Sequence, residues 1–383
     1  MNKLKSLFAV LLLALLSSVA VHTVSANGPG NSDFGLSHLP VCGAAVPGDV
    51  RCNARVVVDR TGQPAIQNIP SGLSPAQFQN AYGVAGVGSQ NNIIAVVDAY
   101  DDPKIASDLA TYDRQFSLPD PTFLKVNQNG QVGNYPKSNP GWALEISLDV
   151  EVAHAMCPTC KLILVEANSA SYSDLMTAVD TAKNLGARVI SNSYGSSEFS
   201  GEGSFDVHFQ DNTTTAFLFS SGDSGYGVQY PAASRYVTAV GGTSLFLSGS
   251  AYSSESVWNG AGSGCSAFES QPGFQNFLTS TCTNRVVADV SADADPNTGA
   301  AVYDSVRYQG RAGWFQVGGT SLAAPLVAGW YGVNGVPTDS RTSLYANAIT
   351  FHDVISGSNG SCGGSLLCTG VVGYDGPTGV GTP

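Results

Sequence analysis

Short apolar runs alternate with helical segments along this chain, and that alternation restricts its possible folds more than any other feature of the sequence. The runs with the length and composition of buried strands are residues 93–97, 162–165, 188–191 and 215–219. One helix is expected over residues 173–185, ended by Gly186, and another begins with Asp102 as its cap and Pro103 at its first position. Strands that alternate with helices favour a mostly parallel central sheet covered by helices on both faces. We therefore predict an α/β fold.

Composition divides the chain into three regions. Residues 1–26 hold two lysines, then an apolar run, and end in small residues, which is the order of a secretory signal peptide. Residues 27–73 are rich in Gly, Pro and Asn without periodicity, so we expect an extended leader there. Residues 74–383 contain neither a linker-like break nor an apolar run of the roughly 18 residues that a membrane helix needs. These features predict a secreted protein with a single large domain and no membrane segment.

Charge excludes some partners of this chain. The formal net charge is −12, and removal of Lys3 and Lys5 with residues 1–26 takes it to −14. A chain this acidic is not expected to bind nucleic acid or an anionic membrane. Only 12% of the residues are charged, against about 25% in an ordinary soluble domain. A surface built on Ser, Thr, Asn and Gly stays polar when carboxylates are protonated, which suits acidic surroundings.

The eight cysteines fit an oxidising compartment because their number is even and they lie in sequence-local pairs. Proximity predicts four disulfides, which are Cys42/Cys52, Cys157/Cys160, Cys265/Cys282 and Cys362/Cys368. The Cys157-Pro-Thr-Cys160 stretch also has the spacing of a redox motif or of half a zinc site. A structural disulfide is the favoured interpretation because no second pair with this spacing completes a zinc site.

A candidate nucleophile, Ser321, lies in the stretch VGGTSLAAP over residues 317–325. The glycines predict a turn that leads into an apolar helix, so the serine hydroxyl faces outward and the helix dipole favours negative charge near it. A serine hydroxyl needs a neighbouring base to take its proton, and the stretch itself contains none.

The base is either a histidine or a carboxylate on the helix expected around residues 141–154. Glu145 and Asp149 share a face of that helix, whereas His154 lies about 180° from Glu145 and about 140° from Asp149. The helix is apolar almost all round, so the two carboxylates are expected to be buried, where paired acids share a proton and acquire separated pKa values. A triad of Ser321, His154 and Asp98 stays as an alternative that the helix geometry disfavours.

Another glycine-rich stretch, Ser221-Gly-Asp223-Ser224-Gly225, follows the strand at 215–219. In a trypsin-like enzyme Ser224 would be the nucleophile, but the α/β pattern does not fit a double β-barrel. A turn whose Asp223 bonds to its own backbone is the structural alternative.

Together these residues resemble the sedolisin family of serine-carboxyl peptidases, which are relatives of the subtilisins. The resemblance runs from about residue 74 to the end. Its motifs are Glu145-x-x-x-Asp149-Val-Glu-Val-Ala-His-Ala, Val189-Ile-Ser-Asn-Ser-Tyr-Gly195, Ser221-Gly-Asp-Ser-Gly225, Asp289-Val-Ser-Ala-Asp-Ala-Asp-Pro296, Gly319-Thr-Ser-Leu-Ala-Ala-Pro325 and Gly373-Tyr-Asp-Gly-Pro-Thr-Gly379.

The resemblance implies a subtilisin-like fold and hydrolysis of peptide bonds in protein or peptide substrates. It implies that Ser321 is the nucleophile, which forms an acyl-enzyme, that Glu145 is the general base and then acid, and that Asp149 holds Glu145. Asp223 would stabilise the oxyanion, which requires it to be protonated. A protonated Asp223 beside an ionised Glu145 predicts activity at acidic pH.

Further sites also come from the resemblance. Ser193, Tyr194 and Gly195 resemble the segment against which a substrate strand lies, and Trp142 either lines the same cleft or belongs to the core. The residues that resemble the family's calcium site, for one structural Ca²⁺ ion, are Asp353, Val354, Val371, Gly373 and Asp375. Two turn-capping aspartates are the alternative there.

The chain departs from the family pattern at its start. Members carry a large folded propeptide, for which residues 27–73 are too short. Asp98, directly after the first strand, either supports the Glu145/Asp149 pair or caps a turn. We expect a monomeric endopeptidase, and the competing hypothesis is an inactive relative that serves as a secreted binding protein.

Overall fold

A largely parallel β-sheet lies at the centre of the computed structural model, which describes residues 36–84, 92–210 and 214–383. The order along the sheet is β12-β11-β9-β7-β4-β6-β5, and β15 also pairs with β11. The strands are β4 (Ile93–Ala99), β5 (Phe123–Asn127), β6 (Lys161–Ala167), β7 (Val189–Asn192), β9 (Ala216–Ser220), β11 (Thr238–Ser248), β12 (Ala251–Val257) and β15 (Val290–Asp293). Only the β11–β12 pair is antiparallel. The predicted mostly parallel α/β sheet is confirmed, and each of its four predicted strands is present.

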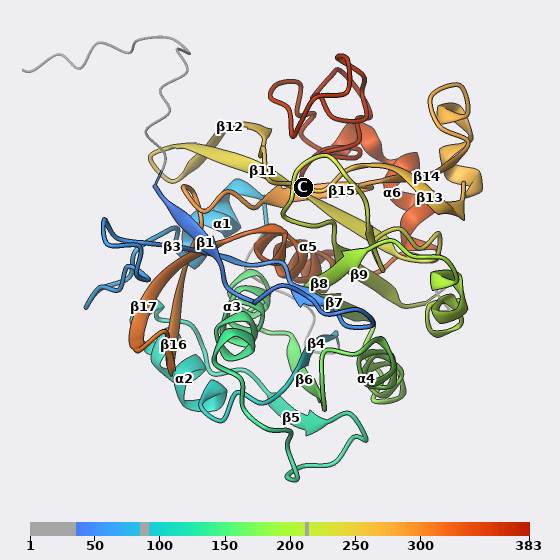
Figure 1. Ribbon diagram of the computed structural model, residues 1–383. Coiled ribbons are helices and arrows are strands. Elements are labelled where there is room, and N and C mark those ends of the chain that lie inside the picture. The colour runs from blue at the N-terminus through green and yellow to red at the C-terminus, as the bar shows by residue number, and fades with distance from the viewer. Residues whose placement is uncertain (1–35, 85–91, 211–213) are drawn as a thin grey trace, which may run out of the picture. The chain divides into compact units, whose positions relative to one another are not determined.

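Helices cover both faces of this sheet, with α3 and α5 against one face and α4 against the other (Figure 1). The helices are α1 (Pro75–Ala81), α2 (Ile105–Phe116), α3 (Pro140–Met156), α4 (Tyr172–Asn184), α5 (Thr320–Asn334) and α6 (Ser340–Ala346). Asn139 caps α3 by accepting hydrogen bonds from the N–H groups of Gly141 and Trp142, and Pro140 follows at the first helical position, where its missing N–H costs nothing. Every residue of α3 from Trp142 to Met156 is buried, which places its carboxylates inside the protein.

Two predicted helix starts differ from the structure. Helix α4 begins one residue earlier than expected because Ser171 caps it, accepting a hydrogen bond from Asp174 N–H. Helix α2 begins at Ile105, two residues after Pro103, so Asp102 is not its cap. The Asp102 carboxylate instead accepts hydrogen bonds from Lys104 N–H and from the Ser147 hydroxyl of α3.

The described part of the expected leader, residues 36–73, belongs to the same compact unit as the rest of the described chain, which runs from Leu36 to Pro383, and residues 27–35 lie outside the described residues. Its strands pair with strands from distant parts of the sequence, in the orders β1-β3-β17-β16 and β10-β8-β2. These strands are β1 (His38–Pro40), β2 (Arg51–Cys52), β3 (Arg55–Val57), β8 (Tyr194–Ser197), β10 (Gln229–Tyr230), β16 (Ala300–Tyr308) and β17 (Arg311–Gly318). A further antiparallel pair joins β13 (Gly264–Ser270) to β14 (Asn284–Val287).

All four predicted disulfides are present. The Cys157–Cys160 bridge closes the turn at the end of α3, so these cysteines are structural. The predicted signal peptide, residues 1–26, lies outside the described residues. Within the described ranges, the structure contains no helix that is long and apolar enough to cross a membrane.

Candidate active site

Helices α3 and α5 bring the predicted base and the predicted nucleophile together inside the protein. Ser321 is the second residue of α5, which follows Gly319 in a left-handed conformation (φ 101°). Glu145 and Asp149 lie on one face of α3, and both carboxylates and Ser321 are fully buried. Pro325 has no N–H to offer the Ser321 carbonyl, which instead accepts a hydrogen bond of 3.4 Å from the Ser193 hydroxyl.

Burial determines the electrostatics of this acid pair. It raises the pKa of Glu145 well above its ordinary value, and the negative charges of Asp149 and Asp98 raise it further, while the nearby Ser321 hydroxyl opposes the rise. Burial and the charge of Asp98 raise the pKa of Asp149, and the nearby Ser193 hydroxyl lowers it. Within residues 36–84, 92–210 and 214–383, no oxygen of Glu145 or Asp149 has a hydrogen-bond partner in the resting geometry. Burial also raises the pKa of Asp98 to about 8. Three buried carboxyl groups next to one serine hydroxyl form a group that exchanges protons easily.

Asp98 thus belongs to the surroundings of the acid pair. It lies within strand β4, one residue before its end and not after it as expected, and it is fully buried, and neither of its oxygens has a hydrogen-bond partner within the described part of the chain. An aspartate that capped a turn would accept backbone hydrogen bonds. Of the two interpretations drawn from the sequence, the structure favours support of the Glu145/Asp149 pair.

The side chain of Asp223 contacts Thr320, the first residue of α5 and the neighbour of Ser321. Its Oδ1 accepts hydrogen bonds from Thr320 N–H (2.8 Å) and from the Thr320 hydroxyl (3.0 Å). Its Oδ2 is buried without a hydrogen-bond partner within residues 36–84, 92–210 and 214–383. Burial raises the pKa of Asp223 to about 6, although the bonds from Thr320 and the charge of Arg55 oppose the rise. Below that pH the carboxyl has a proton to donate.

The predicted substrate-binding segment is occupied by the protein itself. Ser193 O accepts hydrogen bonds from the Ser321 hydroxyl (3.1 Å) and from Asn53 N–H (3.0 Å). Tyr194 and Gly195, in β8, pair antiparallel with Cys52 and Arg51 of β2. Residues of the leader therefore lie where the resemblance places a substrate strand.

Trp142 lies at the edge of this segment and is 4% exposed. Its ring centroid is 6.3 Å from that of Tyr100 and 6.4 Å from that of Tyr194. It borders a cavity of about 390 Å³, whose other walls include residues 41–46 of the leader. Trp142 is thus a core residue, and the cavity that it borders does not include Ser193, Tyr194 or Gly195, so a role in binding substrate stays a prediction.

Asn53 is a site residue that sequence reasoning missed. Its carbonyl oxygen accepts a hydrogen bond of 3.0 Å from Ser321 N–H. Its side chain is buried, and Nδ2 donates to the Ser220 hydroxyl (2.9 Å) and to Gln229 Oε1 (3.2 Å). No local pattern marks this asparagine, because its partners come from three distant segments of the chain.

Gly319 is the position at which the site tolerates a side chain least. A Cβ there would lie 2.2 Å from Asn53 O and 2.6 Å from Asp223 Oδ2, in a backbone conformation that side chains rarely adopt. We expect Gly319→Ala to lower kcat/KM on a peptide substrate by more than about 100-fold, because the start of α5 must shift. The measurement is the initial rate of hydrolysis at pH 4 to 5.

The matched control for that prediction is Gly335→Ala, at the other end of the same helix. Gly335 also has a positive φ of 84°, but a Cβ there meets nothing within 4 Å. The Gly335→Ala substitution is therefore expected to introduce conformational strain alone. It should lower the free energy of unfolding by about 1–2 kcal/mol and leave the activity unchanged. Equal losses of activity in the two variants would mean that strain, and not crowding at the site, explains the effect.

His154 is held far from the acid pair's face of α3. Its Nε2 lies 3.1 Å from Asp113 Oδ1 and 3.0 Å from Pro119 O, and the ring is buried. The alternative triad of Ser321, His154 and Asp98 is therefore not formed. Ser224 is exposed, and its hydroxyl accepts a hydrogen bond from Arg51, which gives a trypsin-like role for it no support.

The residues predicted to hold calcium come together around one loop. Asp353 Oδ2 accepts a hydrogen bond from Gly373 N–H (2.9 Å), and Asp375 Oδ2 accepts one from Val371 N–H (3.1 Å). Burial raises the pKa of Asp375 to about 7, and the negative charge of Asp353 adds to the rise. Two carboxylates that repel each other across a glycine-containing loop, next to the buried residue Val354, suit a hard cation with oxygen ligands.

Comparisons with known proteins agree with this fold. A model of the subtilase family matches residues 126–334. Sedolisin of Pseudomonas sp. (strain 101) is 28% identical over 81% of this chain and 60% of its own length, and kumamolisin of Bacillus sp. (strain MN-32) is 29% identical over 82% and 62%. The chain thus spans about three fifths of these relatives. The structure of Pseudomonas sedolisin, a serine-carboxyl proteinase complexed with two molecules of pseudo-iodotyrostatin, is 27% identical with a TM-score of 0.68, over 82% of this chain and 95% of that one. The chain belongs to the subtilase family, and within it resembles the sedolisins.

Proposed function

We propose that this protein is a secreted serine-carboxyl endopeptidase that hydrolyses peptide bonds at acidic pH. The observation that carries the proposal is the burial of the Ser321 hydroxyl near the buried Glu145 carboxyl, whose pKa it lowers, together with the effects of Asp149 and Asp98 on that carboxyl. The named relatives, sedolisin and kumamolisin, support it, and one matching structure is described as a serine-carboxyl proteinase.

The reaction follows from these positions. Because the pKa of Glu145 is raised, only the minority of molecules in which its carboxyl is ionised react in acid. In these molecules Glu145 takes the proton of Ser321 as the hydroxyl oxygen attacks the substrate carbonyl, and Asp149 holds Glu145. The negative charge that develops on the carbonyl oxygen is stabilised by Ser321 N–H and by protonated Asp223. Glu145 then donates its proton to the departing amine, which leaves an ester on Ser321. Water hydrolyses that ester with Glu145 again acting as base.

Asp223 gives the activity its expected upper pH limit. An ionised Asp223 accepts hydrogen bonds but cannot donate one, so we expect hydrolysis by the wild-type enzyme to decline as pH rises through about 6. Asp223→Asn supplies an amide that donates at every pH, so this variant should lose the decline near pH 6. The measurement is kcat/KM against pH between 3 and 8.

The control variant, Asp223→Ala, lacks any donor and is expected to lose about 10²–10³ in kcat at all pH values. An upper limit near pH 6 that persists unchanged in Asp223→Asn would assign the titration to another group.

A structural Ca²⁺ ion at Asp353 and Asp375 completes the proposal. We expect removal of Ca²⁺ with a chelator at pH 8, above the pKa of about 7 of Asp375, to lower the melting temperature by at least about 5 °C, because the two ionised carboxylates then face each other without a counterion. Differential scanning calorimetry with and without added Ca²⁺ measures this. Unchanged melting after chelation would favour two turn-capping aspartates.

A further inference from the structure

The leader lies in the groove beside Ser321 with the backbone pattern of an extended peptide substrate. Arg51 and Cys52 pair antiparallel with β8, and the next residue, Asn53, continues this ladder through its N–H to Ser193 O. An extended peptide that adds a strand to an exposed sheet edge is a common mode of peptide recognition. The ladder ends at Asn53, next to the nucleophile.

The carbonyl of Asn53 occupies the position where an oxyanion would be stabilised. Its oxygen is 3.0 Å from Ser321 N, which donates a hydrogen bond to it. A Cβ on Gly319 would contact both Asn53 O and the unpaired Asp223 Oδ2, so these two oxygens border the same small space. In acid, protonated Asp223 is placed to be the second donor to this carbonyl.

The side chain of Asn53 fills a polar pocket next to the nucleophile. It is 1% exposed, and its amide donates to Ser220 and Gln229. A buried amide with matched acceptors is recognised specifically, because an apolar side chain in its place would leave both acceptors unpaired.

We propose that the peptide bond between Asn53 and Ala54 is a self-cleavage site, and that residues 36–53 inhibit the enzyme until this bond is cut. The proposal rests on the proposed peptidase function and identifies its first substrate. In the uncut chain Ser321 is fully buried, so an external substrate cannot reach it.

The chemistry uses the groups already present and one water molecule. Ser321 Oγ bonds to the carbonyl carbon of Asn53 while Glu145 takes the hydroxyl proton. The bond from this carbon to Ala54 N breaks, and Glu145 gives the proton to that nitrogen, which becomes a free amine. Water then hydrolyses the ester between Ser321 and Asn53, so the products are a carboxylate at Asn53 and a new N-terminus at Ala54.

The test follows the full-length protein at pH 4 to 5 by intact mass and N-terminal sequencing. We expect the wild type to acquire an N-terminus at Ala54, at a rate that does not change over about a 100-fold range of protein concentration. Ser321→Ala should stay uncut. Asn53→Leu should slow this cleavage by at least about tenfold, since leucine cannot donate to Ser220 or Gln229.

Hydrolysis of a denatured protein substrate, measured in the same samples, separates the two proposals. Hydrolysis of that substrate by a chain whose bond at 53–54 stays intact would overturn self-cleavage and leave the peptidase function standing. Absence of both reactions would overturn both. The Ser321→Ala protein, purified from a host without peptidases, is the last control. Cleavage of its 53–54 bond would assign the cut to another group and overturn this proposal.

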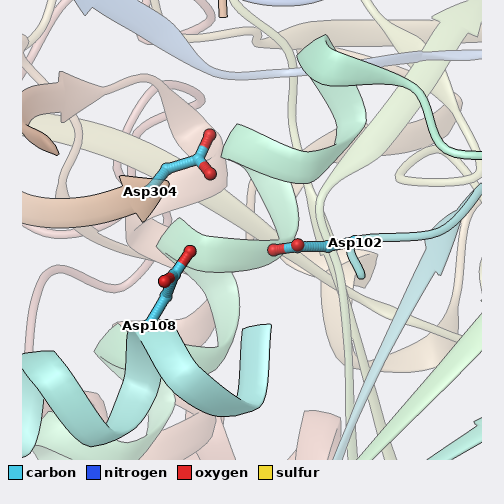
Figure 2. Close-up of side chains that lie close together, drawn as sticks. All are labelled: Asp102, Asp108 and Asp304. Carbon is cyan, nitrogen blue, oxygen red and sulfur yellow. The ribbon is translucent and has the colours of Figure 1, made fainter. Parts of the chain in front are cut away.

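A separate cluster of three buried aspartates, Asp102, Asp108 and Asp304, indicates a second cation site. Asp102 precedes α2, Asp108 lies in the first turn of α2, and Asp304 lies in β16. All three are buried, and one oxygen of each lies within 4.8 Å of the others. Figure 2 shows the three carboxylates turned toward one another beside helix α3.

Among the described residues, the carboxylates of the cluster have no ion-pair partner. Within residues 36–84, 92–210 and 214–383, Asp304 Oδ2 and Glu151 Oε1 are buried without a hydrogen-bond partner, and the charges of Asp108 and Asp304 act on Glu151. Lys125 donates to the backbone carbonyl of Asp102 (2.6 Å), but its ion pairs are with Asp101 and Glu166. Burial first, and then mutual repulsion, raises the pKa of Asp304 to about 8.

The ligand chemistry indicates a hard cation. Oxygens that lie no more than 4.8 Å apart can contact one ion, because Ca²⁺ binds oxygens at about 2.3–2.6 Å. The hydroxyls of Ser147 and Ser305 donate to Asp102 and Asp108 and keep these carboxylates in place. We infer that Asp102, Asp108 and Asp304 bind a divalent cation of the calcium type, apart from the site at Asp353 and Asp375.

Two single substitutions distinguish the sites, both made with Ser321→Ala to prevent self-cleavage. Calcium titration calorimetry at pH 7 should find two ions in the parent, one in Asp304→Asn and one in Asp353→Asn. Chelation should also lower the melting temperature of Asp353→Asn further. An Asp353→Asn protein that binds no Ca²⁺ would overturn the proposal. The proposal would also be overturned if Asp304→Asn raised the melting temperature by the same amount with and without Ca²⁺. That result would mean that the three carboxyl groups share protons and bind no cation.

Discussion

Glu145→Gln is expected to lower kcat/KM on a peptide substrate by about 10³–10⁴-fold at pH 4 to 5. The amide cannot accept the proton of Ser321, and general base catalysis typically contributes about 10²–10⁴ to the rate. Ser321→Ala removes the nucleophile and should lower kcat/KM by at least as much. The double variant should have a kcat/KM no lower than that of the less active single variant, because the two groups act as a unit.

This assay has to be made on chains whose groove is open. Variants without activity cannot remove residues 36–53 themselves, and Asn53 and Ala54 are buried in the uncut chain, so the wild type and all variants are assayed as chains that begin at Ala54. Otherwise a low rate that is caused by residues 36–53 covering the groove would be attributed wrongly to the loss of the general base.

The control for the Glu145 prediction is His154→Gln, on the same helix. His154 contacts Asp113 and Pro119, so we expect its loss to reduce stability and to leave kcat/KM within about threefold of the wild type. The reverse result, an active Glu145→Gln and an inactive His154→Gln, would restore the serine–histidine triad.

The stability of the folded protein is expected to fall as pH rises from 4 to 8, with the melting temperature lowered by at least about 10 °C. A cluster of acids between η1 (Glu202–His208) and β13 carries this effect. Burial raises the pKa of Glu202 to about 8, with the charge of Glu198 adding to the rise, and it raises the pKa of Glu269 to about 7, with that of Asp206 adding.

The sign follows from the protons that each state binds. In the unfolded chain these carboxyls lose their protons near pH 4, whereas in the folded protein they keep them to about pH 7 or 8. Between these limits the unfolded state binds fewer protons, so each increase in pH favours unfolding. Below pH 4 both states are protonated and the stability of the fold is fully present.

Calorimetric melting of the Ser321→Ala protein at constant Ca²⁺ measures this dependence. Glu202→Gln and Glu269→Gln are neutral at every pH, so each should make the decline shallower. A melting temperature that stays constant or rises between pH 4 and 8 would contradict the prediction.

The central sheet was predictable because local periodicity determines it. Runs such as residues 93–97 and 162–165 are apolar at every position, which only a strand buried on both faces requires. The acid pair was predictable for a similar reason, since spacing alone puts Glu145 and Asp149 on one face of a helix and His154 on the other. The disulfides followed from short separations in sequence.

Features that depend on contacts between distant segments were not predictable. The leader looks unstructured because it pairs with β8 and β17 and has no periodicity of its own. The role of Asn53 depends on Ser321, Ser220 and Gln229 meeting around it. The start of α2 was placed too early because Ser147 of α3 and the backbone of Lys104 hold Asp102 away from the cap position.

The disulfides of this protein all close short loops, and none of them crosses the bond after Asn53. Cys42–Cys52 lies wholly before that bond, and the other three bridges lie wholly after it. Once the bond is cut, only noncovalent contacts, chiefly the pairing of β1 with β3 and of β2 with β8, retain the first fragment. Dilution would then separate it without any reducing agent, and the change from dormant to competent enzyme would be irreversible.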